Sequence, residues 1–184
     1  MPKFVLPGLI VVAAAALLAL LTFGVSHNSD ARSIDARVAH GSFPTPPDYT
    51  TPLPMLDSSK HLDLASLKGK VVVLNMFASW CDACHAEAKM LVDEQKLLAK
   101  HDATVLGVTW NDNSSATTQF DRQYGIRYPV VRDVTGNFVH AFGTRQLPET
   151  FIINRQGKIQ ALRRFQLSQT WLDKTLTPIL REKS

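Results

Sequence analysis

The sequence predicts a mixed α/β domain with helices on both faces of one sheet. Its centre is the apolar, β-branched run Val71–Phe77, which is typical of a buried strand. Two cysteines, Cys81 and Cys84, follow with C-x-x-C spacing, and the stretch from there to Lys100 has no Gly or Pro and favours a helix. Strands and helices then alternate before a hairpin and a closing helix, which is the order of a layered α/β fold.

The other elements can be placed in order along the chain. Helices are expected at Cys84–Lys100, Ser114–Tyr124 and Gln169–Leu180, with a helical turn at Gly136–Phe142. Further strands are expected at Ala103–Trp110, Tyr128–Arg132, Thr150–Asn154 and Ile159–Phe165. Ahead of the core, residues 53–56 and 62–64 alternate enough to predict a short N-terminal hairpin.

The N-terminal region predicts an anchor followed by a tether. No charged residue occurs from Phe4 to Val25, a length sufficient to cross a bilayer as a helix, so residues 1–25 are expected to be a transmembrane anchor. The alternative is a cleaved signal peptide, and both outcomes export the domain. Residues 26–54 are expected to form an extracytoplasmic tether, because they are rich in proline and such segments are extended. The folded domain would then occupy residues 55–184.

Composition excludes several classes of function. The net charge of +4 is modest and its signs are interspersed, so we infer no nucleic-acid role. Half of a zinc site is a poor alternative, because the chain has only two cysteines and its six histidines are scattered. A purely structural disulfide between Cys81 and Cys84 would close too small a loop to constrain the unfolded chain. The pair suits a redox dithiol, which requires no metal or other cofactor.

The two cysteines are expected where a strand ends and a helix begins. Unpaired N–H groups and the helix dipole stabilise a thiolate there, so Cys81 is the predicted nucleophile and Cys84, one turn further, the resolving thiol. Glu87 shares a helical stripe with Cys84 and Leu91, and a partly buried carboxyl has a raised pKa that suits proton exchange near neutrality. The alternative is a surface carboxyl at the edge of the stripe, which Glu94 also shares.

Asp82 and His85 flank the dithiol with opposite expected effects. A carboxylate beside Cys81 disfavours its thiolate and makes the couple a better reductant, whereas a protonated imidazole does the reverse. Because histidine is mostly neutral at pH 7, we expect a reductant. The alternative for either side chain is a solvated surface group.

The segment Trp80–Cys84, directly after an apolar strand, resembles the redox motif of the thioredoxin superfamily. Leu67–Asn75 and Leu147–Asn154 are similar to segments of its membrane-anchored TlpA-like branch, which includes the CcmG/DsbE-type thiol-disulfide reductases of cytochrome c maturation. The similarity covers residues 50–180. It implies a thioredoxin-like fold in which Ser114–Arg132 is a central helix-strand insertion.

The resemblance also implies a substrate groove. The matching proline of the superfamily, here Pro148, is cis and faces the dithiol, which leaves the backbone of Leu147 free to pair with an extended client segment. Trp80 is expected to lie partly exposed over the site, with plain core packing as the alternative. A glutamate at the position of Glu87 tunes the second cysteine in this branch. Asn75 stands where bacterial-type thioredoxins carry a buried acid, so Glu87 would replace that proton acceptor.

Residues and resemblance together predict a thiol-disulfide oxidoreductase. A single-pass helix would hold it in the bacterial inner membrane with its domain in the periplasm. The expected substrates are protein disulfides, such as that of the haem-binding C-x-x-C-H pair of apocytochrome c, and electrons would come from a thiol-disulfide protein of the membrane. The alternatives are a general disulfide reductase or isomerase with other clients, a haem- or metal-handling binding module, and a structural assembly factor.

Overall fold

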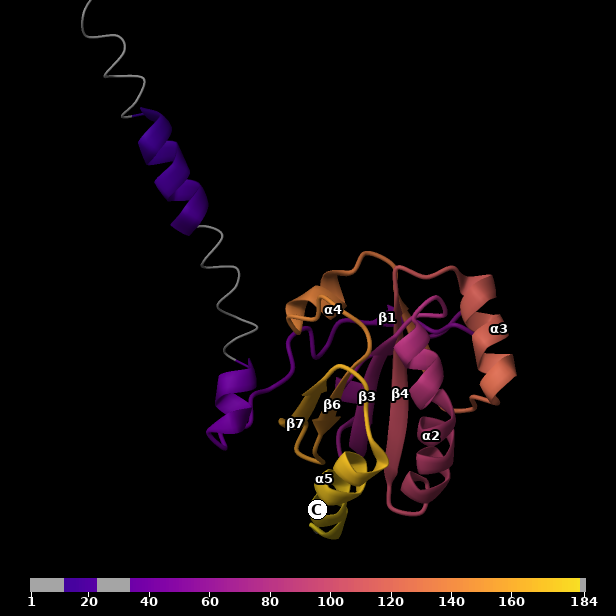
Figure 1. Ribbon diagram of the computed structural model, residues 1–184. Helices are drawn as coiled ribbons and strands as arrows, with labels where there is room; N and C mark the ends of the chain where they lie inside the picture. Colours follow the sequence, from indigo (N-terminus) through magenta and orange to yellow (C-terminus); the bar gives the residue numbers. More distant parts are fainter. Residues whose placement is uncertain (1–11, 23–33, 183–184) are drawn as a thin grey trace, which may run out of the picture.

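A five-stranded sheet with the strand order β5-β4-β3-β6-β7 forms the centre of the protein (Figure 1). The structure is a computed structural model that describes residues 12–22 and 34–182. Strand β6 runs antiparallel to β3, and β7 runs antiparallel to β6, whereas β3, β4 and β5 are parallel. The bounds are β3 Val71–Phe77, β4 Ala103–Trp110, β5 Val130–Asp133, β6 Glu149–Ile153 and β7 Ile159–Arg164. The predicted mixed α/β sheet is confirmed.

Strand β3 is central because both of its faces are covered. All seven of its residues are buried, as the apolar, β-branched run predicted. Successive side chains point to opposite faces, so Val73 lies in one hydrophobic cluster while Val72 and Leu74 lie in the other. The same alternation places the polar Asn75 on the face of Val73.

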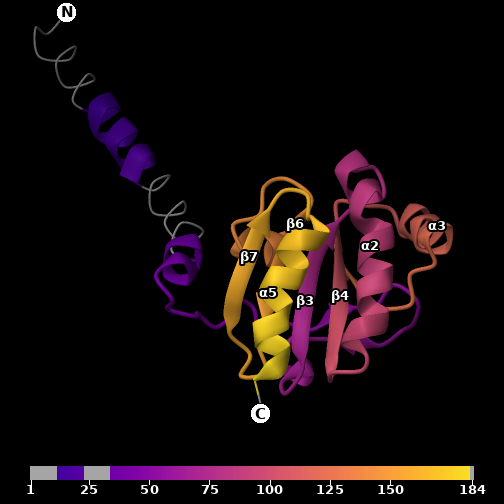
Figure 2. The ribbon, with the colours of Figure 1, turned by 60° about the horizontal axis from the view of Figure 1, so that its bottom comes forward.

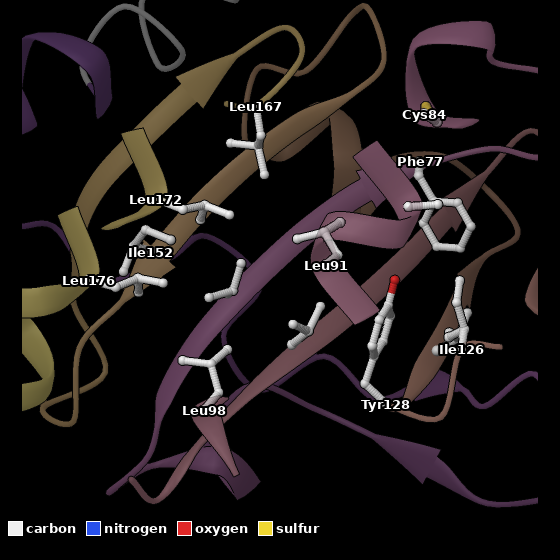
Figure 3. Close-up of a cluster of buried hydrophobic side chains, with 14 of the residues drawn as sticks. Phe77, Cys84, Leu91, Leu98, Ile126, Tyr128, Ile152, Leu167, Leu172 and Leu176 are labelled. Atoms are coloured by element: carbon white, nitrogen blue, oxygen red, sulfur yellow. The ribbon is translucent and has the colours of Figure 1, made fainter. Parts of the chain in front are cut away.

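Helices cover the first of these faces. In Figure 2, α2 (Asp82–Leu98) and α5 (Gln169–Arg181) lie in front of the sheet, with α3 (Ser114–Tyr124) beside α2. Leu91 of α2 and Leu172 of α5 belong to one buried cluster with Ile152 of β6 (Figure 3). The helix-strand pair α3–β5 lies at the place where the resemblance implied a central insertion.

The second face is covered by shorter pieces. They are the short helix α4 (Asn137–Ala141), the 3₁₀ turn η1 (Ala65–Leu67) and the hairpin of β1 (Leu53–Pro54) and β2 (His61–Leu62). The predicted N-terminal hairpin is therefore confirmed, although each strand is only two residues long. In the loop between these two strands, Met55 bridges to Val131 and so ties the hairpin to the edge strand β5.

Residues 34–50, which we call the N-terminal segment, pack on the domain, whereas the sequence predicted an extended tether over residues 26–54. Ile34 is buried in the second hydrophobic cluster. The carbonyl of Pro44 accepts a hydrogen bond from the N–H of Ile159 at 2.9 Å, and the Lys158 ammonium donates to Thr45 Oγ1 at 2.7 Å. The physical reason is that β7 is an edge strand with unpaired backbone groups, which this segment covers. Residues 26–33 lie outside the described residues.

The predicted transmembrane anchor lies only partly within the described residues. Residues 12–22 are helical and exposed, and residues 1–11 and 23–25 lie outside the description. Among the described ranges, no helix is long and apolar enough to cross a membrane.

Candidate active site

The dithiol lies at the first turn of α2. Cys81 is the N-cap residue of this helix, in an extended conformation, and it forms a disulfide with Cys84. Its sulfur accepts a hydrogen bond from the N–H of Cys84 at 3.2 Å. Both cysteines are largely buried, with 6% of Cys81 and 2% of Cys84 exposed. A thiolate formed at Cys81 on reduction would face the free N–H groups and positive dipole of the helix start, which lower its free energy.

The loop before Cys81 is held by Asp112, which follows β4. Its carboxylate accepts hydrogen bonds from the N–H and the hydroxyl of Ser79, both at 2.7 Å. It also accepts from the hydroxyl of Thr117 in α3 at 2.9 Å. Asp112 therefore fixes the corner between β3 and α2 against the next strand and helix. Sequence reasoning missed this residue, although an acid directly after a parallel strand is a usable signal.

His85 is tied to structural partners on both ring nitrogens. Nε2 lies 2.8 Å from the carbonyl oxygen of Ser79, and Nδ1 lies 2.8 Å from the hydroxyl of Tyr124. A carbonyl only accepts, so Nε2 carries the hydrogen and the hydroxyl donates to Nδ1 in the neutral ring. His85 thus braces the active-site corner against α3, and neither nitrogen is left for the sulfurs. Asp82, by contrast, is exposed in the first turn of α2.

Glu87 is buried inside the domain, one turn after Cys84. Only 1% of it is exposed. The Asn75 amide donates to one carboxylate oxygen at 2.8 Å, and the N–H of Leu167 donates to the other at 2.8 Å. Burial raises the pKa of Glu87 to about 7, and these two hydrogen bonds act in the opposite direction. The carboxyl can therefore gain or lose a proton near neutral pH.

Cys84 and the amide that holds Glu87 border one small space. This space is too narrow for a water molecule and is lined by Cys84, Asn75 and Tyr128 among others. Figure 3 shows Tyr128 with its hydroxyl directed between Phe77 and Leu91. Water is thus excluded from the region beneath the dithiol, and such exclusion raises the pKa of a buried carboxyl.

The predicted groove residues lie around the start of β6. The Leu147–Pro148 peptide bond is cis, as the resemblance implied. Leu147 is half-buried between the two hydrophobic clusters and precedes the first paired residue of β6, Glu149. Among the described residues, no hydrogen bond uses its backbone N–H or carbonyl.

Two contacts connect the groove with the rest of the site. Thr150, two residues after Pro148, accepts from the Asn75 amide at 3.0 Å, and that amide also holds Glu87. Trp80 is 56% exposed and donates from its indole nitrogen to the carbonyl of Asn111 at 2.9 Å. The Asn75 amide thus links Glu87 to β6, the strand that follows Pro148. The structure sets Trp80 at the surface beside Cys81, where we expected a partly exposed ring.

Within the described ranges, no group of three or more His, Cys, Asp or Glu side chains is gathered closely enough to hold a metal ion. The chemistry available from these side chains is that of two sulfurs and one carboxyl.

Comparison with known proteins gives related families and folds. The chain is 31% identical over 102 residues to the thiol-disulfide oxidoreductase ResA of Bacillus subtilis (strain 168), covering 55% of this chain and 57% of that protein. It is 32% identical over 113 residues to the thiol:disulfide interchange protein DsbE of Pasteurella multocida (strain Pm70), covering 61% of this chain and 60% of that protein. These matches thus span less than two thirds of each relative.

Solved structures agree on the fold. A thiol:disulfide interchange protein of the thioredoxin family from Chlorobium tepidum TLS superposes with a TM-score of 0.61 at 28% identity, over 71% of this chain and 96% of that one. A secreted disulfide oxidoreductase of Mycobacterium tuberculosis, homologous to E. coli DsbE, gives 0.63 at 22% identity, over 71% and 97%. The family model described as AhpC/TSA matches residues 45–162. The chain therefore belongs to the AhpC/TSA family, in its thioredoxin-like fold, and its relatives support the TlpA-like, CcmG/DsbE-type branch.

Proposed function

We propose that the protein is a thiol-disulfide oxidoreductase that reduces disulfides of client proteins. The single observation that carries this proposal is the Cys81–Cys84 pair at a helix start, with the buried carboxyl of Glu87 one turn beyond it. The names of the relatives ResA and DsbE support the same class of reaction. The dithiol is its own redox centre, so the proposal needs no further cofactor.

The reaction is a pair of balanced exchanges. In the reduced protein, the Cys81 thiolate attacks one sulfur of the client disulfide, and a mixed disulfide forms while one client thiolate leaves. The Cys84 thiol then gives its proton to Glu87, and the resulting thiolate attacks the Cys81 sulfur. The second client thiolate leaves and takes up a proton. The client has gained two electrons, and the protein ends as the Cys81–Cys84 disulfide.

The role of Glu87 rests on matched proton affinities. A thiol has an ordinary pKa near 8.5, and an ordinary glutamate, near 4.3, would accept its proton poorly. Because the pKa of Glu87 is raised to about 7, its carboxylate is a better base and is still present at neutral pH. Asn75 and the N–H of Leu167 hold the carboxyl in one orientation during the transfer.

Client binding is proposed along the Leu147–Pro148 corner. An extended client segment would pair with the backbone of Leu147 as an added strand and bring its disulfide toward Cys81. Trp80 would cover the other side of the entering chain. Backbone pairing is independent of sequence, which suits an enzyme whose clients differ beyond their cysteines.

The setting we propose is the periplasmic side of a bacterial inner membrane, with apocytochrome c as a client and a thiol-disulfide membrane protein as the electron donor. The uncharged run of residues 4–25 supports an anchor. If this run crosses the membrane, residues 26–33 reach at most about 28 Å before the chain is docked at Ile34. The domain would then be held near the bilayer, which supports a donor that is itself a membrane protein.

A trapping experiment tests the proposed function. In a Cys84→Ser variant the mixed disulfide on Cys81 cannot be resolved, so client proteins should accumulate as covalent adducts that a reducing agent releases. A Cys81→Ser variant is the matched control and should capture nothing. Mass spectrometry then identifies the adducts. If Cys84→Ser forms no adduct while its Cys81 is readily alkylated, the proposed exchange is wrong. Adducts that lack apocytochrome c would refute the proposed client alone.

A further inference from the structure

A side pocket lies next to the Leu147–Pro148 corner. It has a volume of about 660 Å³, and most of its exposed lining is apolar. Its wall comes from three parts of the chain: Asp35 and Ala36 of the N-terminal segment, Gly143, Arg145, Gln146 and Glu149 around the proline corner, and Arg164 and Phe165 at the end of β7. Gln146 directly precedes Leu147, so the pocket continues the proposed groove.

The strand registers place this pocket at the same end of the sheet as the dithiol. Met76, near the end of β3, pairs with Glu149 at the start of β6, and Glu149 pairs with Arg164 at the end of β7. Cys81 follows the same end of β3. A client chain lying along Leu147 therefore passes the mouth of the pocket.

The N-terminal segment is held in this wall by Arg164. The guanidinium donates to both oxygens of Asp35, at 2.7 and 3.2 Å, and also pairs with Glu149. It donates to the carbonyl of Phe142 at 3.1 Å as well. Arg164 thus connects three parts of the chain: the N-terminal segment at Asp35, the loop before the groove at Phe142, and β6 at Glu149. The contact with Asp35 adds to the burial of Ile34 in holding Ala36 in the pocket wall.

The chemistry of the pocket favours an apolar occupant. Arg164 is paired with both Asp35 and Glu149, so this guanidinium is not available to an acidic ligand. Phe165 is 62% exposed at the rim, in a left-handed conformation with φ 72°, and so presents an aromatic ring to solvent. Burying an exposed apolar side chain against such a surface contributes about 25 cal/mol per Å².

We propose that the N-terminal segment completes the client site, and that the side pocket receives an apolar side chain of the client within three residues of its reactive cysteine. This inference rests on the proposed function and adds a preference in sequence to it. The chain that leads to the predicted anchor is then also a part of the recognition surface.

Peptides with one activated cysteine test the inference. Each peptide carries its cysteine as a mixed disulfide with a chromophoric aryl thiol, and Leu or Asp stands in turn at each of the three positions on either side. The reduced full-length protein is mixed with each peptide, and the release of the aryl thiol gives the rate constant. We expect Leu to react about ten-fold faster than Asp at one position, the equivalent of about 1.4 kcal/mol.

Two variants test whether the preference for Leu over Asp arises in the side pocket. Ala36→Asp places a carboxylate in the pocket wall and should reduce the ratio of the Leu and Asp rates to about two or lower. Thr170→Asp, which adds the same charge at an exposed position of α5, should keep the ratio of the wild-type protein. An equal ratio in Ala36→Asp and the wild type would overturn the inference, as would the absence of any preference in the wild type. The latter result is also expected if another part of this chain or a second copy fills the pocket.

A small aryl disulfide that carries no peptide distinguishes a failure of the side-pocket proposal from a failure of the proposed function. If the wild-type protein reduces it but shows no preference among the peptides, the side pocket is not a client site and the exchange chemistry stands. If the reduced protein reacts with neither the small disulfide nor any peptide, the proposed function itself has failed.

Discussion

The buried carboxyls of Glu87 and Glu149 lie on opposite faces of β6, the strand that follows the Leu147–Pro148 corner, and they differ in their hydrogen-bond partners. Glu87 belongs to the face of α2, and the neighbouring residue of β6 on that side is Thr150. Glu149, one residue earlier in β6, is 6% exposed and contacts Thr144 and Arg164. The first carboxyl is held by an amide and a backbone N–H, whereas the second is held by a hydroxyl and a guanidinium.

Because of this difference in partners, one carboxyl is suited to proton transfer and the other to holding the groove in shape. Burial raises the pKa of both carboxyls. At Glu149 the Thr144 hydroxyl and the charge of Arg164 oppose the rise, and any proton gained would leave the guanidinium without one of its counter-ions. At Glu87 the partners are neutral, so its proton can come and go without breaking an ion pair. Glu87 is suited to the reaction, and Glu149 with Arg164 is suited to holding the groove in shape.

The largest effect is expected when Arg164 is removed. Arg164→Met leaves the Glu149 carboxyl buried and Asp35 half-buried without a cation, which should lower the free energy of unfolding by about 3 kcal/mol. Urea unfolding of the oxidised protein at pH 7 measures the loss. The matched control Lys96→Met breaks an exposed ion pair on α2 and should cost at most about 0.5 kcal/mol.

A second substitution checks the cause of this loss. If the unpaired carboxylate is responsible, adding Glu149→Gln to Arg164→Met should restore part of the stability, because the buried charge is then gone. A loss for Arg164→Met that is no greater than for the control would show that the ion cluster does not hold the groove.

The next effect concerns Glu87 and its pH dependence. An unfolded glutamate titrates near 4.5 and the folded one at about 7, so the folded state binds the proton more tightly. Glu87 therefore costs no stability below pH 4.5, and its cost grows as the pH rises to 7, to a total of about 3 kcal/mol. In Glu87→Gln this cost is absent at every pH.

The measurement is urea unfolding of the oxidised protein at pH 5 and pH 8. The wild-type protein should lose about 2.5 kcal/mol more than Glu87→Gln between these two values. The control Asp82→Asn removes an exposed carboxyl from the same helix and should follow the wild type. Parallel curves for Glu87→Gln and the wild type would mean that Glu87 is charged across the whole range and is no proton acceptor near neutrality.

Local patterns in the sequence predicted some of these features and not others. Glu87 was accessible to prediction, because the 3.6-residue helical period sets it on the stripe of Cys84 and Leu91, although Glu94 shares that stripe and the period did not decide between them. The Arg164–Asp35 pair was not, because its residues lie 129 positions apart and nothing local to either one signals the other. The N-terminal segment was misjudged for a related reason. Its prolines exclude regular hydrogen bonding, but they do not exclude burial against an edge strand.

The smallest effect concerns Asn75, which is a neutral hydrogen-bond partner of Glu87. The Asn75 amide lowers the pKa of Glu87 through its hydrogen bond, so Asn75→Ala should raise that pKa above 7 by the equivalent of one hydrogen bond, about 1 kcal/mol. NMR titration of the Glu87 carboxyl carbon in the oxidised protein measures the change. Thr150→Val is the matched control, because it removes the other partner of the amide and leaves the bond to Glu87 in place. A pKa that falls in Asn75→Ala, or that moves equally in both variants, would show that the amide does not set the proton affinity. Burial and the N–H of Leu167 would then set the pKa of Glu87.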